Sequence, residues 1–182
     1  MAVPFILKAE WIPLNKQNNL SAPPNVTLIS DDISSTVIKI EISGFELNDF
    51  TSGDKQYQQI DLLSESFTTS PGLPELPYIA KVLAIPDYAG VSYEVLQVGD
   101  FVSFSNVYLP PARESWFEGS PETPYTENAD AFNSFSSYPG EYVQIESPSV
   151  FRDFRIARVS FFPIQYNAAK KELQVTTSIT VR

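Results

Sequence analysis

The chain has 182 residues with a formal net charge of −10 at pH 7, and it contains no histidine and no cysteine. These absences exclude Ser–His and Cys–His nucleophilic pairs, a histidine general base, and metal sites built from thiolate or imidazole. The negative charge repels nucleic acid and anionic lipid, so we expect neither as a partner. We expect no cofactor and no metal.

The composition favours strands over helices. Aromatic residues make up 13% of the chain, which also has 15 prolines and only 7 glycines. Aromatic and β-branched residues between frequent prolines are typical of strands and turns. A chain of this length is large enough for one domain with a real core. No apolar run has transmembrane length, so we expect no membrane insertion.

Short apolar runs broken by proline open the chain, at residues 3–7 and 10–14. Proline lacks the N–H that a sheet ladder needs, so these runs predict edge strands. We expect residues 1–25 to form an N-terminal edge segment, within a single domain whose sandwich spans residues 26–182. The first four residues lack the basic and apolar parts of a signal peptide, and we interpret the start as that of a mature or trimmed chain.

The remaining pattern predicts an all-β protein. Alternating or continuous apolar residues predict strands at residues 36–42, 57–62, 78–85, 91–96, 101–108 and 141–146. With roughly ten strands and no convincing amphipathic helix, we expect an antiparallel β-sandwich, jelly-roll-like in type.

The C-terminal residues predict a closing hairpin. In residues 172–181 apolar side chains alternate strictly with polar ones, as in a strand with one face on a core. Residues 154–162 are apolar on both faces, and residues 167–171 form a short turn between the two strands.

Two proline-rich stretches interrupt the strands. Residues 70–77 hold three prolines, and we interpret them as a stiff crossing between two sheets; the alternative is a proline-rich ligand for another module. Residues 110–140 have no clear period and predict a long loop, which its many aromatic residues should pack against the domain. In that loop Trp116 and Phe117 either cover a sheet end or join Arg113 in a protruding contact that docks on a partner.

Three blocks resemble the N-terminal propeptide domain of the gingipain-type (C25) cysteine peptidases. They are Gly72-Leu73-Pro74-Glu75-Leu76-Pro77 with the following Ile85-Pro86, then Tyr138-Pro139-Gly140-Glu141, and finally Arg152-Asp153 with residues 163–167, 171–173 and the alternating tail. Their order and spacing carry the resemblance, which covers about residue 26 to the end.

The resemblance implies a non-catalytic, secreted bacterial propeptide. Such a β-sandwich keeps the caspase-like cysteine peptidase domain of the same precursor inactive, and assists its folding or export. The absence of cysteine and histidine agrees, because this chain cannot itself be the peptidase. The alternative is a secreted β-sandwich binding or adhesion module whose loop aromatics stack on sugars.

This chain departs from the family pattern at one position. Family inhibitors fill a primary specificity pocket with a basic residue from the loop before the Tyr-Pro-Gly-Glu block. In that register the position falls near Phe117, whereas Arg113 lies four residues earlier. The register indicates Phe117 and the family chemistry indicates Arg113; we favour Arg113, because Pro110-Pro111 stiffens the chain before it. The expected partner-binding residues are therefore Arg113, Trp116 and Phe117.

Overall fold

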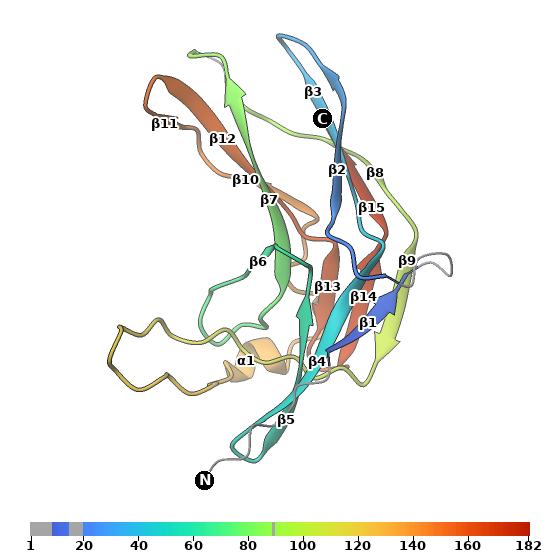
Figure 1. Ribbon diagram of the computed structural model, residues 1–182, viewed down its shortest axis with the longest axis vertical. Helices are drawn as coiled ribbons and strands as arrows, with labels where there is room; N and C mark the ends of the chain where they lie inside the picture. Colours follow the sequence, from blue (N-terminus) through green and yellow to red (C-terminus); the bar gives the residue numbers. More distant parts are fainter. Residues whose placement is uncertain (1–8, 15–19, 89) are drawn as a thin grey trace.

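The computed structural model describes residues 9–14, 20–88 and 90–182. Within these ranges it has fifteen strands and one short helix, and the strand pairs are antiparallel. The molecule is elongated, and two hairpin arms diverge at one end of it (Figure 1). The all-β prediction is confirmed. The predicted edge strand at residues 3–7 lies outside the described residues.

The strands form four sheets. One sheet has the order β1-β4-β5, with β1 (Ala9–Pro13), β4 (Gly44–Ser52) and β5 (Lys55–Asp61). A second has the order β2-β3-β15-β8, with β2 (Asn25–Asp31), β3 (Thr36–Glu41), β15 (Ser178–Val181) and β8 (Val95–Val98). A third has the order β13-β14-β9, with β13 (Ile164–Asn167), β14 (Glu172–Thr176) and β9 (Phe101–Ser105).

The remaining sheet has the order β10-β12-β7-β6, with β11 also paired to β12. Its strands are β10 (Val143–Ile145), β11 (Ser149–Phe151), β12 (Phe154–Phe161), β7 (Pro77–Ile85) and β6 (Ser66–Phe67). Residues 70–77 run from β6 into the start of β7. Our interpretation of them as a crossing between two sheets is therefore wrong, because they connect two strands of one sheet.

The described residues form fifteen strands where ten were expected, because the sequence pattern missed β2, β4, β6, β11 and β13 and because a bend divides the last predicted strand into β14 and β15. A closing C-terminal hairpin is confirmed, but its strands are β13 and β14 and not the expected residues 154–162 and 172–181. At Pro163, which has no N–H to continue a ladder, β12 leaves to pair with β7. At Thr177 the chain bends, and β15 continues between β3 and β8.

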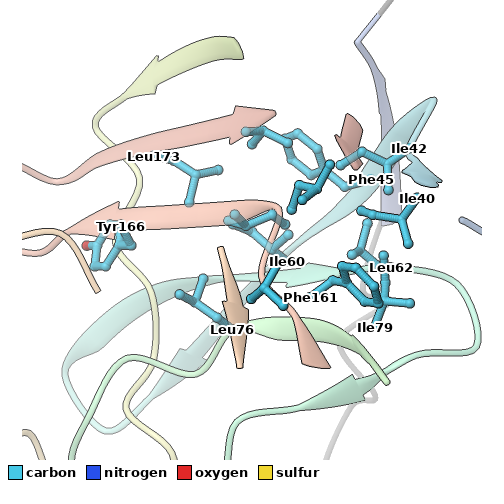
Figure 2. Close-up of a cluster of buried hydrophobic side chains, with 14 of the residues drawn as sticks. Ile40, Ile42, Phe45, Ile60, Leu62, Leu76, Ile79, Phe161, Tyr166 and Leu173 are labelled. Carbon is cyan, nitrogen blue, oxygen red and sulfur yellow. The ribbon is translucent and has the colours of Figure 1, made fainter. Parts of the chain in front are cut away.

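One core joins all four sheets, so the predicted antiparallel sandwich is confirmed. Figure 2 shows Ile40, Phe45, Ile60, Phe161 and Leu173 converging from different strands. The sandwich follows from the period of its longer strands, because β3, β12 and β14 each turn an apolar face to this cluster.

Tyr166 is a buried residue of the core that holds the chain on both sides of the long loop, at Val107 and at Tyr138. Its hydroxyl donates to the Val107 carbonyl at 2.9 Å, and its backbone exchanges two hydrogen bonds with Tyr138. The side chain of Gln165 accepts from the Gly140 N–H at 2.8 Å and donates to the Glu141 carbonyl at 3.0 Å. This docking accounts for the Tyr-Pro-Gly-Glu block, whose glycine has a φ of +87° that other residues rarely adopt.

Glu127, in the second half of the long loop, binds side chains of the β4–β5 hairpin and of the segment that follows β9. One carboxylate oxygen accepts from Lys55 Nζ at 2.5 Å, Tyr57 OH at 3.0 Å and Tyr108 OH at 2.5 Å. Burial acts to raise the pKa of Glu127, but these three hydrogen bonds together outweigh it and hold the pKa below the usual 4.5. Burial, and next the hydrogen bond to Glu127, raise the pKa of Tyr57 to about 12.

We predict that Ile179→Asp abolishes folding. Ile179 is fully buried between Ile40 and Val98 on the two neighbouring strands, where an unpaired carboxylate loses its hydration. The variant should show no cooperative thermal transition in far-UV circular dichroism. Ile33→Asp is the control, because Ile33 is almost fully exposed in the β2–β3 turn, and it should stay within about 0.5 kcal/mol of the parent.

We predict that Glu127→Gln lowers the free energy of unfolding by about 1–3 kcal/mol at pH 7. A carboxyl whose folded pKa is depressed stabilises the fold above its unfolded pKa of 4.5, and this contribution is lost as pH falls through the folded pKa. The difference between the two proteins should therefore shrink in urea unfolding below pH 4.5.

Glu118→Gln is the control, because Glu118 is an exposed carboxylate of the same loop. A pH dependence of unfolding that is the same in the parent and in Glu127→Gln would contradict a role for this cluster.

Candidate functional site

The long loop begins where the two proline-rich stretches pair with each other, and we call this pairing of residues 72–75 with residues 110–112 the base of the loop. The N–H of Glu75 donates to the Pro110 carbonyl at 2.9 Å, and the N–H of Ala112 donates to the Leu73 carbonyl at 2.8 Å. Gly72 then closes the base, donating to the Ala112 carbonyl at 2.9 Å and accepting from the Asn128 N–H at 3.0 Å. Both ends of the loop therefore meet at one glycine.

Only glycine suits this meeting point. Gly72 has a φ of +80°, and a Cβ there would lie 3.2 Å from the Cβ of Asn128. The left-handed backbone and the close approach both favour a residue without a side chain. The prolines on either side stiffen the pairing, because each fixes its own φ.

The prediction that aromatic residues pack the loop against the domain is only partly right: Phe132 is buried and Tyr125 and Tyr138 are half-buried, whereas residues 114–122 and Phe135 are exposed. Asn128 caps the short helix α1 (Ala129–Phe132), accepting from the N–H groups of Asp130 and Ala131. Phe132 at its end belongs to the core. This helix was not expected from the sequence, in which its only local signal is the capping asparagine with an acid in the first turn.

Arg113 is held inside the loop. Its guanidinium lies 4.4 Å from the ring centroid of Trp116 and 4.8 Å from that of Tyr125, and it forms a 2.8 Å ion pair with Glu122. Only 21% of its side chain is exposed. The loop thus places Arg113 and Trp116 together, in an arrangement we call the arginine clamp: Arg113, Trp116, Glu122 and Tyr125.

Phe117 lies apart from the clamp, at the tip of the loop. Its side chain is 87% exposed, against 42% for Trp116. A tight turn displays it: the Phe117 carbonyl accepts from the N–H of Ser120 at 3.0 Å and from its hydroxyl at 2.7 Å, and Gly119 has a φ of +86°. Below the turn, Thr123 Oγ1 donates to the Glu114 carbonyl at 2.6 Å and closes the neck of the loop.

The tip is acidic. Glu114 and Glu118 are exposed beside Phe117, and Arg113, the only basic residue in positions 110–140, is already paired with Glu122. This surface can offer an apolar ring with negative charge around it. It has no nucleophile with an adjacent base, so it is suited to binding and not to catalysis.

A separate hollow lies between the two arms, where residues of β2 and β3 face residues of β7 and β12. It has a volume of about 730 Å³, and its walls mix apolar residues such as Leu83 and Val159 with the charged Glu94 and Arg182. In the described part of the chain no group of three or more acidic residues is placed to hold a metal ion. Among the same residues no helix is long and apolar enough to cross a membrane.

Comparison with protein families gives a match over nearly the whole chain. Residues 16–182 match the family model described as Propeptide_C25. Gingipain R1 of Porphyromonas gingivalis is 28% identical over 170 residues, which cover 91% of this chain and 17% of that protein. Gingipain R2 of the same species is 27% identical over 161 residues, covering 87% and 22%. The chain spans less than a quarter of the length of these relatives.

Two solved structures share the fold. The complex of the pro- and mature domains of RgpB from P. gingivalis aligns with a TM-score of 0.78 and 23% identity, over 86% of this chain and 82% of that one. A structure concerned with the zymogenic latency of gingipain K from the same species aligns with a TM-score of 0.80 and 20% identity, over 96% and 97%. At these identities the likeness concerns the fold.

The resemblance drawn from the three sequence blocks is therefore confirmed. Most of each block has a defined place in the fold: residues 72–77 lie in the base of the loop, the second block is docked on Tyr166, and residues 163–173 belong to the closing hairpin. Ile85-Pro86 and Arg152-Asp153 lie apart from these, at the end of β7 and in the β11–β12 turn. Family match, shared fold and the lack of any cysteine or histidine agree, and the chain belongs to the C25 propeptide family as a non-catalytic pro-domain.

Proposed function

We propose that this chain binds the cysteine peptidase domain of its own precursor, keeps it latent, and assists its folding or export in an exported bacterial protein. The observation that carries the proposal is the stiff loop, which displays an exposed aromatic ring on a base closed at Gly72. Family membership supplies the class of partner.

The loop has the physical properties of a preorganised inhibitor. A free peptide loses conformational entropy when it is bound, whereas a loop already ordered by its fold has met that cost during folding. Here the ladder to residues 72–75, the Glu127 cluster and the arginine clamp order the loop from its base to its neck. Arg113, Trp116 and Phe117 are the proposed contact residues, with Arg113 as the internal support of Trp116.

Sugar binding by the loop aromatics is less well supported. A carbohydrate stacks on an open aromatic face, but Arg113 covers one face of both Trp116 and Tyr125. Phe117 is the ring that stands free, and a single projecting ring fits a pocket better than it forms a platform.

We predict that replacing residues 115–122 by Gly-Gly removes inhibition while the domain stays folded. The Thr123–Glu114 hydrogen bond shows that the ends of this segment lie close together, and closure entropy changes only slowly with loop length. The melting temperature should therefore stay within a few degrees of the parent. The inhibition constant should rise at least about a hundredfold, since most of an interface's binding energy comes from a few residues.

The measurement is inhibition of the catalytic domain encoded by the same gene, with a peptide substrate and purified chain added in trans. Phe154→Ala is the control, because Phe154 is an exposed aromatic residue of the β11–β12 hairpin and should leave inhibition unchanged. If the parent chain does not inhibit at micromolar concentration, latency is not its function. If the shortened chain inhibits as well as the parent, the inhibitory surface lies elsewhere.

A further inference from the structure

We infer that Phe117, and not Arg113, is the side chain that the loop inserts into its partner, and that the receiving pocket is apolar with basic residues at its rim. The inference rests on the proposed latency function and names the chemistry of the partner's pocket. It departs from the expectation drawn from family chemistry, which favoured Arg113.

Arg113 is poorly placed to enter a pocket. It directly follows Ala112, which is buried in the base of the loop, so its backbone lies at the foot of the projecting segment. Its guanidinium would have to leave two aromatic faces and the Glu122 carboxylate before it could reach a partner. Because Glu122 already balances the charge of Arg113, a carboxylate of the partner would only replace the Glu122 carboxylate.

Phe117 has the opposite properties. Its ring is 87% exposed, and it stands on a turn whose backbone is held by two hydrogen bonds from Ser120. An exposed aromatic ring gains free energy only when something removes it from water. Because a phenylalanine has two side-chain torsions, ordering it in a pocket is less costly than ordering a long flexible arginine.

The negative charge around the tip indicates which charge the rim of the partner's pocket should carry. Glu118 follows Phe117 directly and Glu114 lies three residues before it, both exposed. A pocket that recognises arginine or lysine is itself acidic, and these carboxylates would repel it. A basic rim would attract them and would steer the tip toward the pocket. The peptidase domain should therefore prefer apolar side chains in the pocket that Phe117 fills.

The experiment measures inhibition constants of the parent chain and of Phe117→Ala, Phe117→Leu, Phe117→Arg and Arg113→Ala against the catalytic domain of the same gene. Phe135→Ala is the matched control, since Phe135 is an aromatic residue of the same long loop and is 73% exposed. Two reporter peptides that differ only in having phenylalanine or arginine before the cleaved bond give the peptidase's preference independently of the inhibitor.

We expect Phe117→Ala to weaken inhibition at least about thirtyfold, as for a hot-spot aromatic residue. Phe117→Leu should retain most of the inhibition, Phe135→Ala should match the parent, and Phe117→Arg should be weaker still than Phe117→Ala. The phenylalanine reporter should be cleaved faster than the arginine reporter. Better inhibition by Phe117→Arg, or an arginine preference, would overturn the inference.

Arg113 has a separate signature as a positioning residue. Arg113→Ala should weaken inhibition less than Phe117→Ala does, and it should reduce the near-UV circular dichroism of tryptophan because Trp116 loses its stacking partner. Phe117→Ala should leave that tryptophan signal unchanged. A larger loss of inhibition from Arg113→Ala than from Phe117→Ala, with the tryptophan signal intact, would make Arg113 the inserted residue.

Glu118→Lys tests the rim. We expect it to slow association about tenfold at low salt and to change dissociation little, because charges at a rim act mainly on the rate of encounter. Faster association of Glu118→Lys would show an acidic partner surface. If the proposed latency function is wrong, the parent chain itself will not inhibit the peptidase. If only the inference about Phe117 is wrong, the parent will inhibit and Phe117→Ala will inhibit equally well.

Discussion

The backbone pairing between residues 72–75 and 110–112 is the constraint on which the position of the long loop depends. It brings together two proline-rich stretches that are far apart in the chain, and it makes both ends of a long loop meet at Gly72. Leu76 and Leu109, beside the two stretches, are fully buried, so the ladder is continuous with the core. The loop therefore moves with the sandwich, because its base is part of the sandwich.

Above this base, the polar residues of the loop are used mainly to order it. Glu127 gathers three donors from the β4–β5 hairpin and from residues after β9, and Glu122 compensates the charge of Arg113. The arginine clamp turns a cation that could have met a partner into an internal support. At the tip of the loop, the ring of Phe117 and the carboxylates of Glu114 and Glu118 stay exposed.

The same sandwich at only 20–23% identity in two solved structures shows how little of the sequence the fold requires. The requirements are a period of apolar residues in the strands, a few positions with a left-handed backbone such as Gly72 and Gly140, and buried polar groups with partners, as at Tyr166. Phe117, which is exposed and outside the core, is not among these requirements. A change of pocket chemistry between relatives is therefore compatible with an unchanged scaffold.

The class of the protein could be predicted from the sequence. The lack of cysteine and histidine excluded a cysteine peptidase, period-two patterns located β3 and the last strands, and three spaced blocks indicated the family. The sequence could not reveal β2, whose residues are mostly exposed and carry no core-facing period, nor the division of the C-terminal strands between sheets at Pro163 and Thr177. In those places neighbouring strands, and not local pattern, select the pairing.

The candidate site, too, could be predicted from the sequence only in part. The sequence showed that Arg113, Trp116 and Phe117 lie together in an acidic aromatic loop, but an irregular segment has no period from which side-chain direction can be inferred. Which of the three is enclosed depends on Tyr125 and Glu122 returning along the opposite side of the loop, and that return is set by the closure at Gly72. That Arg113 is enclosed and Phe117 exposed became visible only in the folded chain, because Tyr125 and Glu122 reach the guanidinium from across the loop and join the nearby Trp116 in enclosing it.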